Sequence, residues 1–147
     1  MPVFLETVSA PSEQDHADLQ KVLADWPESL PPLHAADISH SDFLKQLLAD
    51  PAQQVLGGRF NGRLIAMVWL EGSTQDTCTL RALCVRKLTR SRGVGERLLT
   101  LLGQQLDKTG QQLICDLPMP LPTRAWIGQY GFRSGDTPGR LVRPPRS

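Results

Sequence analysis

The sequence predicts a mixed α/β domain, and two features of its 147 residues carry the prediction. Short apolar runs of strand length alternate with longer segments whose apolar residues recur at helical spacing. In addition, a basic, glycine-rich loop at Arg90–Gly95 separates an apolar run from the most amphipathic segment of the chain. The length fits one packed core, and contents of 40% hydrophobic and 21% charged residues are those of an ordinary globular protein.

The N-terminal part is expected to form a strand at Val3–Val8 and then a helix that begins after Ser12. Ser12 followed by Asp15 resembles a capping box, and Pro27 ends the helix. A second, short helix is expected before Pro51. The helical spacing i, i+3, i+4, i+7 of the first helix rests on Leu19, Val22, Leu23 and Trp26.

The middle of the chain predicts three strands. Gln54–Phe60 and Arg63–Leu70 are joined by Asn61-Gly62, a pair preferred in type I′ hairpin turns. After a polar turn, Thr77–Val85 is expected to form the next strand. An antiparallel meander therefore precedes the glycine-rich loop.

The C-terminal part is expected to contain a long helix at Gly93–Lys108, a short strand at Leu113–Leu117 and a short helix at Thr123–Tyr130. From Gly135 onward the chain is polar, rich in proline and basic. We interpret residues 135–147 as a loosely attached tail after a single domain of residues 1–134.

The loop has the chemistry of an anion site. It carries the pattern R-x-x-G-x-G as Arg90, Gly93 and Gly95. Glycines let the backbone approach a bulky anion, and the first N–H groups of a helix have no intrahelical partner. These amides and the helix dipole suit a pyrophosphate. Six basic residues surround this loop in the sequence, and Glu96 is the acidic residue among them. The basic residues are Arg81, Arg86, Lys87, Arg90, Arg92 and Arg97.

Two other glycine motifs do not fit. A dinucleotide-binding loop needs a further glycine three residues after Gly95, and a Walker loop needs Gly-Lys-Ser/Thr where Gly95-Glu96-Arg97 stands. Placed after the fourth strand of this element order, R-x-x-G-x-G instead resembles the acyl-CoA motif of the GNAT superfamily of N-acetyltransferases.

The GNAT resemblance implies an acyl-CoA N-acyltransferase fold, a mixed and mostly antiparallel sheet flanked by helices, and it implies acetyl-CoA or CoA as ligand. In that superfamily the strand before the loop parts from its neighbour and pairs with the pantetheine arm, here through Leu83–Val85. The residues that the resemblance assigns to the ligand are Leu83, Cys84, Val85, Thr89, Arg90, Ser91, Arg92, Gly93, Val94, Gly95 and Glu96.

Three segments, Val85–Leu99, Arg59–Val68 and Asp18–Ser29, resemble a narrower family, the PanZ/PanM-type maturation and regulatory factors of aspartate 1-decarboxylase. The segment Leu33–Pro51 departs from it as an insertion. The resemblance implies an acetyl-CoA-dependent regulator in pantothenate (CoA) biosynthesis, which promotes self-cleavage of the decarboxylase proenzyme and restrains the mature enzyme. It also implies that the hairpin Arg59–Asn61 and the basic loop face the partner.

Groups for acetyl transfer are missing at the expected positions. Alignment on Gly131-Phe132 places Ile127 where many GNAT enzymes have an acidic Tyr, with Trp126 before it and Tyr130 a turn away. The strand Thr77–Val85 contains no carboxylate that could act as a base. We therefore assign no catalytic residue and expect little or no acetyltransferase activity. A catalytic N-acetyltransferase that uses an amine acceptor is the alternative.

Other features limit the possible partners and compartments. A net charge of +1 and 5% aromatic residues do not favour nucleic-acid binding. No apolar stretch is long enough to cross a membrane, so the cytoplasm is the expected location. The three cysteines, Cys78, Cys84 and Cys115, lack C-x-x-C spacing, and the histidines lack metal-ligand spacing, so neither a disulfide framework nor a metal site is expected. Cys84 is interpreted as a buried structural residue.

Overall fold

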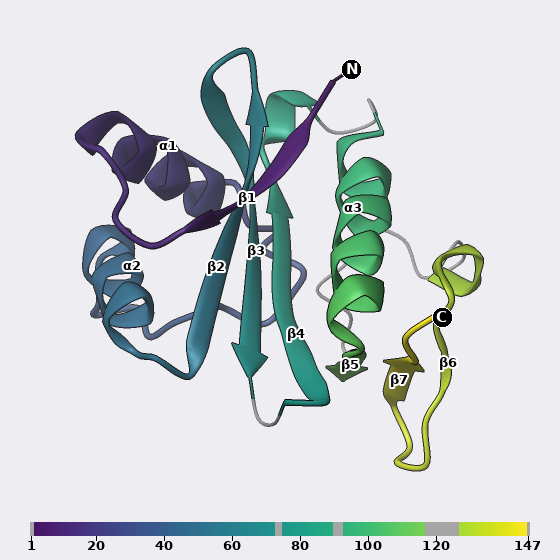
Figure 1. Ribbon diagram of the computed structural model, residues 1–147. Helices are drawn as coiled ribbons and strands as arrows, with labels where there is room; N and C mark the ends of the chain where they lie inside the picture. The colour runs from purple at the N-terminus through teal and green to yellow at the C-terminus, as the bar shows by residue number, and fades with distance from the viewer. Residues whose placement is uncertain (1, 73–74, 90–92, 117–126, 147) are drawn as a thin grey trace.

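The computed structural model describes residues 2–72, 75–89, 93–116 and 127–146 (Figure 1). Its α-helices are α1 (Glu13–Ala24), α2 (His40–Ala49) and α3 (Val94–Thr109), and its 3₁₀ turns are η1 (Lys87–Thr89) and η2 (Ile127–Tyr130). Its strands are β1 (Phe4–Val8), β2 (Gln53–Phe60), β3 (Arg63–Gly72), β4 (Thr77–Val85), β5 (Gln112–Asp116), β6 (Arg133–Ser134) and β7 (Arg140–Arg143).

The strands form one sheet in the order β1-β2-β3-β4-β5-β7-β6. Neighbouring strands are antiparallel except β4 and β5, which are parallel and are connected through α3. The predicted mixed, mostly antiparallel sheet flanked by helices is therefore confirmed.

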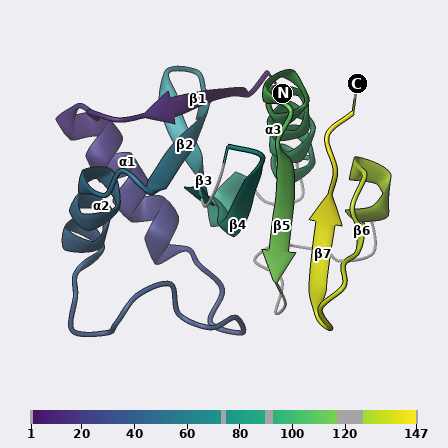
Figure 2. The ribbon, with the colours of Figure 1, turned by 60° about the horizontal axis from the view of Figure 1, so that its bottom comes forward.

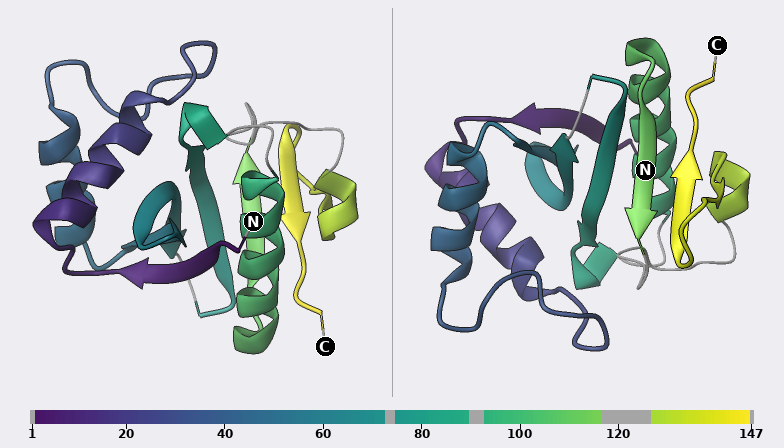
Figure 3. Two further views of the ribbon diagram at one scale, coloured as in Figure 1. Left: turned by 90° about the horizontal axis from the view of Figure 1, so that it is seen from above. Right: turned by 90° about the horizontal axis from the view of Figure 1, so that it is seen from below.

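Helices cover both faces of the sheet, and each face has its own core (Figures 1 and 3). α1 and α2 lie together on one side of β2–β4, where Leu19, Leu44 and Met67 are fully buried. α3 lies on the other side, where Leu98 and Leu102 pack against the sheet. Within the described part of the chain, no helix has the length and apolar character needed to cross a membrane.

β4 and β5 are paired over only three residues of each strand. The ladder joins Thr77–Thr79 to Gln112–Ile114, and the rest of β4 runs on with β3 as its partner (Figure 2). The β3–β4 register skips Arg81, because Trp69 faces Ala82 while Leu70 faces Leu80. Such a bulge bends a strand and increases its twist. β4 thus diverges from β5 just beyond the point where the two halves of the sheet meet.

The sequence correctly predicts most element positions. β4 has the predicted bounds, and the Asn61-Gly62 turn joins β2 to β3 with positive φ at both residues, 50° and 78°. Ser12 caps α1 by accepting a hydrogen bond from the Asp15 amide at 3.1 Å. α3 ends at the left-handed Gly110, as expected. Residues 123–126 of the predicted last helix lie outside the described residues, and the remainder forms η2.

The predicted C-terminal tail is wrong. Arg140–Arg143 form β7, which pairs with β5, and Arg133–Ser134 form β6 beside it. Arg143 is 5% exposed, and its guanidinium donates to both carboxylate oxygens of Asp107 on α3 and to the Tyr130 carbonyl. A side chain at Gly103 would meet this guanidinium at 2.8 Å, so the glycine makes room for it. The sequence indicates a tail because residues 135–147 are rich in proline and arginine. It does not show that one of these arginines, Arg143, is buried and holds a strand in the sheet.

We expect Arg143→Ala to lower the free energy of unfolding by about 2–4 kcal/mol, because it removes the buried guanidinium that bonds both Asp107 oxygens and the Tyr130 carbonyl. Urea unfolding followed by far-UV circular dichroism measures the loss. Arg133→Ala, on the exposed strand β6, is the matched control and is expected to change stability by less than about 0.5 kcal/mol. Equal stability of both variants would contradict the anchoring role of Arg143.

Candidate functional site

The N-terminus of α3 begins at a glycine. Gly93 is the N-cap in the left-handed conformation, with φ of 76°, and no described side chain makes a capping hydrogen bond there. An added Cβ at Gly93 would meet no described atom within 4 Å. The Arg97 amide makes the first-turn hydrogen bond to the Gly93 carbonyl at 3.0 Å. The amides before Arg97 in the helix have no carbonyl to bond within it, and they carry the positive end of the helix dipole.

The backbone edge of β4 leads to this helix end. Leu83, Cys84 and Val85 lie beyond the β4–β5 ladder, so in the described part of the sheet only β3 pairs with them. Their side chains are buried, Leu83 and Val85 toward α3 and Cys84 toward α1. The end of β4 and the start of α3 lie at the same end of the molecule (Figure 1). An extended ligand with a phosphate group at one end fits this arrangement.

The segment that joins β4 to the basic loop is attached to α1. Asp25, the C-terminal cap of α1, accepts from the Arg86 Nε at 2.8 Å and from the Lys87 amide at 2.9 Å. Thr89 closes η1 by donating its hydroxyl and its amide to the Arg86 carbonyl, each at 2.9 Å. Leu88 is 79% exposed at the surface of this turn. The start of the loop therefore has a fixed conformation, and the Arg86 charge is paired with α1.

The predicted ligand residues divide into two sets. Leu83–Val85 lie in β4, Thr89 lies in η1, and Gly93–Glu96 lie at the N-cap and first turn of α3. Arg90, Ser91 and Arg92 lie outside the described residues, and their roles stay predictions.

Groups for acid–base chemistry remain sparse in the structure. β4 has no carboxylate, as the sequence indicates. Tyr130 lies in η2, where burial and the nearby Glu96 charge raise the pKa of its phenol. Ile127 begins the same turn, and Trp126 lies outside the described residues.

The cysteines are free and buried. Burial raises the pKa of the Cys78 thiol to about 11 and that of Cys115 to about 12, so both are protonated at neutral pH. Cys84 packs among the side chains beneath α1, which agrees with its interpretation as a structural residue. Among the described side chains, no cluster of three or more His, Cys, Asp or Glu residues could hold a metal ion.

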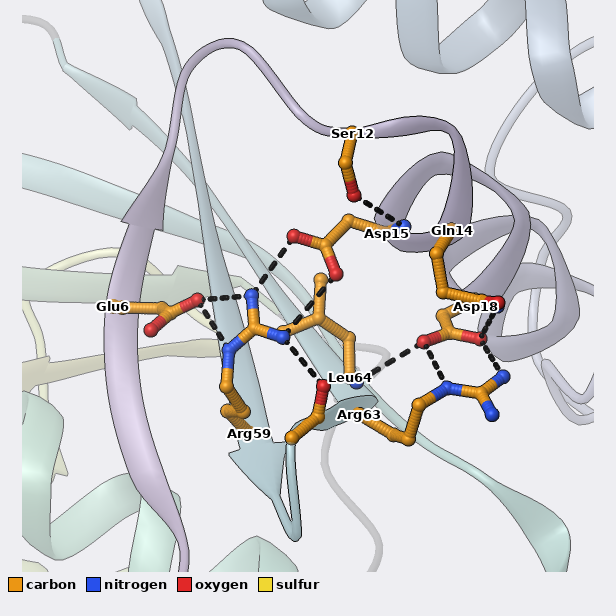
Figure 4. Close-up of polar contacts among 9 residues, drawn as sticks. Glu6, Ser12, Gln14, Asp15, Asp18, Arg59, Arg63 and Leu64 are labelled. Carbon is orange, nitrogen blue, oxygen red and sulfur yellow. Dashed lines mark hydrogen bonds and ion pairs between the residues drawn. The ribbon is translucent and has the colours of Figure 1, made fainter.

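Arg59, predicted to face a partner, is held within the molecule (Figure 4). It is 25% exposed, and its guanidinium contacts Glu6 on β1 and Asp15 on α1 and donates to the Gly62 carbonyl. The Arg59 charge is therefore paired within the molecule, and contact of Arg59 with a partner stays a prediction. Asn61, at the exposed tip of the hairpin, makes no such contact in the described structure and remains available.

Asp18 forms the other half of this network (Figure 4). It is 2% exposed and accepts from the Arg63 guanidinium, the Gln14 amide group and the Leu64 backbone amide. Hydrogen bonds from Arg63 outweigh the effect of burial and lower the pKa of the Asp18 carboxyl. The sequence gives no signal for this pair, since Arg63 lies 45 residues further along the chain.

The segment Leu33–Pro51, which we interpret from the sequence as an insertion, supplies α2, which packs on α1 and β2. His34 precedes α2 and His40 is its first residue, and Nε2 of His34 lies 2.9 Å from Nδ1 of His40. A pocket of about 360 Å³ between the end of α1 and this segment is lined by residues that include Trp26, Leu30, His34 and His40.

The comparisons with known proteins agree with this geometry. A family model described as the acetyltransferase (GNAT) domain PanZ matches residues 2–116. The chain belongs to this PanZ family. The PanD regulatory factor of Escherichia coli (strain K12) is 38% identical over 88 residues, which is 60% of this chain and 56% of that relative. The chain therefore spans little more than half the length of that relative.

Solved structures place the PanZ-family chain in the GNAT fold. An aminoglycoside 6'-N-acetyltransferase complexed with coenzyme A superposes with a TM-score of 0.71 at 14% identity, covering 98% of this chain and 99% of the other. The Escherichia coli protein YhhK bound to coenzyme A superposes with a TM-score of 0.62 at 25% identity, covering 98% and 99%. The ribosomal-protein-S18-alanine N-acetyltransferase of Escherichia coli gives a TM-score of 0.67 at 16% identity, covering 99% and 96%.

The Asp18–Arg63 pair predicts an acid-sensitive stability. Because the pKa of Asp18 is lowered by folding, its contribution is complete above the unfolded value of about 3.9 and is lost as the pH falls through the folded value. We expect Asp18→Asn to lower stability at pH 7 by about 1–2 kcal/mol and to flatten the decline in stability below about pH 4.

Urea unfolding at a series of pH values tests this expectation. Asp107 and Asp116, whose pKa values are also lowered by arginine partners, leave a residual slope in the variant. Asp42→Asn, at an exposed position in the first turn of α2, is the control and should retain the wild-type slope. An unchanged slope in Asp18→Asn would contradict the coupling between Asp18 and Arg63.

Proposed function

We propose that this chain is an acetyl-CoA-binding regulator of aspartate 1-decarboxylase, which promotes maturation of the enzyme and restrains it in pantothenate (CoA) biosynthesis. The observation that carries the proposal is the part of β4 that runs beyond its ladder with β5 and ends near the N-terminus of α3. Membership of the PanZ family and the similarity to a PanD regulatory factor support the choice of partner.

The ligand would be held mainly by backbone groups. The pantetheine arm pairs with Leu83–Val85 as an added strand, and the pyrophosphate accepts from the first amides of α3 at Gly93–Glu96. Thr89, Arg90, Ser91 and Arg92 add contacts that the GNAT resemblance implies. Backbone recognition of this kind needs glycine at Gly93 and Gly95, because a side chain there would stand where the phosphates approach.

The residues at the acid and base positions favour a regulatory function over acetyl transfer. β4 carries no base, and the position aligned with the acidic Tyr of many GNAT enzymes is Ile127. Bound acetyl-CoA then acts as a signal of CoA supply. The three free thiols suit a reducing compartment, and we assign the protein to the cytoplasm.

The proposed partner surface combines the hairpin tip with the loop after η1. Asn61 is exposed at the tip, and Arg59 holds the hairpin against β1 and α1. α1 in turn contacts the start of the basic loop through Asp25. Ligand phosphates would neutralise the self-repulsion of the basic loop and fix its surface for docking.

The first test concerns the ligand. We expect Gly95→Val to reduce acetyl-CoA affinity at least tenfold, because the side chain blocks the pyrophosphate, while stability changes by less than about 0.5 kcal/mol. Isothermal titration calorimetry measures the affinity. Gly93→Val is less suitable, since φ of 76° strains a branched residue. Gln104→Val, on the exposed surface of α3, is the control, and full affinity in Gly95→Val would contradict the site.

The second test concerns the partner. Titration of the chain with aspartate 1-decarboxylase at several acetyl-CoA concentrations should show affinity that rises with ligand. Linkage requires the decarboxylase to tighten acetyl-CoA binding by the same factor. Asn61→Gly, which keeps the positive φ of the turn, should weaken the complex and leave acetyl-CoA affinity unchanged.

Charge reversal at Arg59 is not a clean variant, because it would place a third carboxylate beside Glu6 and Asp15. A complex whose affinity does not depend on acetyl-CoA, or no complex, would contradict the proposal. Acetyl transfer to an amine at about 1 per second or faster would instead favour the N-acetyltransferase alternative.

A further inference from the structure

Arg81 stands at the point where β4 leaves β5. It is the residue that the β3–β4 register skips, so it occupies the bulge of β4. Its side chain is exposed, and its Cζ lies 5.7 Å from the centre of the Trp69 ring. Trp69 packs against the core beneath α1 and α2, which places the Arg81 guanidinium on the face of the sheet opposite α3.

The charge of Arg81 is only partly balanced. The parallel ladder ends at Thr79 and Ile114, and Arg81 and Asp116 each follow two residues later on their strands. The Arg81 charge helps to lower the pKa of Asp116, but the main cause is Arg140. Arg140 donates to both oxygens of that carboxylate, at 2.7 and 3.2 Å. Two guanidinium groups therefore share one carboxylate at the opening.

The Glu71 carboxylate has a hydrogen-bond partner of its own on β2. Glu71 faces Thr79 in the β3–β4 ladder and accepts a hydrogen bond from Gln53 Nε2 at 2.9 Å. Gln53 in turn accepts from the Trp69 indole at 2.6 Å. This chain of hydrogen bonds fixes the indole against which the Arg81 guanidinium lies.

The inference rests on the proposed acetyl-CoA site. Val85 is the end of β4 nearest the N-terminus of α3, where the phosphates are proposed to bind. A strand rises about 3.3 Å per residue, so Arg81 lies about 13 Å along β4 from Val85. A pantetheine arm that runs along β4 from that end carries its thioester toward the opening. The acyl group would then lie beside Arg81, on the side away from the phosphates.

We propose that Arg81 determines acyl specificity by binding a terminal carboxylate, so that the site accepts dicarboxylic acyl-CoA thioesters such as malonyl-CoA as well as acetyl-CoA. A guanidinium presents a planar fork of donors that matches a carboxylate, and charge-assisted pairs of this kind are strong. The Trp69 ring supports the fork from one side. The same positive charge disfavours an ammonium group at this position.

The experiment compares acetyl-CoA, malonyl-CoA and CoA by calorimetry on the full chain and on Arg81→Gln. We expect the ratio of malonyl-CoA to acetyl-CoA affinity to fall about tenfold in Arg81→Gln, with acetyl-CoA and CoA affinities nearly unchanged. Arg81→Lys, which keeps the charge but loses the fork, should give an intermediate ratio. Arg133→Gln on β6, which β5 and β7 separate from β4, removes the same charge and should leave the ratio unchanged.

The possible outcomes separate this inference from the proposed function. An unchanged ratio in Arg81→Gln, or an equal loss of affinity for all three ligands, would overturn the role of Arg81 while leaving the acetyl-CoA site intact. An equal effect of Arg133→Gln would also overturn it, since only the net charge would then matter. Failure of the wild-type chain to bind any of the three ligands would overturn the proposed function and this inference with it.

Discussion

The short parallel pairing of β4 and β5 is the constraint on which the rest of the structure depends. A strand that parts from one neighbour keeps its place only if other contacts hold it. β3 pairs with β4 along nearly its whole length, and α3 packs beneath the point of divergence. β5 is held from its far side by β7, whose arginines Arg140 and Arg143 bond Asp116 and Asp107. The contacts of β3, α3 and β7 thus hold both strands in place where their pairing ends.

Helix α1 connects the two surfaces that the proposed function uses. Near its N-terminus, Asp15 and Asp18 bond Arg59 and Arg63 at the two ends of the hairpin turn. At its C-terminus, Asp25 bonds the Arg86 side chain and the Lys87 amide at the start of the basic loop. In each case an aspartate of α1 or of its C-terminal cap bonds an arginine of the hairpin or of the residue that follows β4. α1 therefore contacts both the hairpin and the segment that leads into the basic loop.

The sequence predicts well whatever depends on local pattern and predicts poorly whatever depends on pairing across the chain. Alternation and the Asn61-Gly62 pair define β2 and β3, and glycines at 93 and 110 mark the ends of α3. The ligand path follows from these local signals. By contrast, the bulge at Arg81, the clamp around Arg59 and the anchor at Arg143 join residues that are distant in sequence. A basic residue at the surface and one that holds a strand look the same in the sequence.

The placement of the three thiols gives the chain an internal reporter of its own motion. Cys78 lies in the paired part of β4, Cys84 in the parted part, and Cys115 on β5 across the divergence. All three are shielded from solvent, so a thiol reagent can reach each one only when the surrounding strands open. The relative rates at which they are modified would therefore map, without any added label, how far the two halves of the sheet separate in solution.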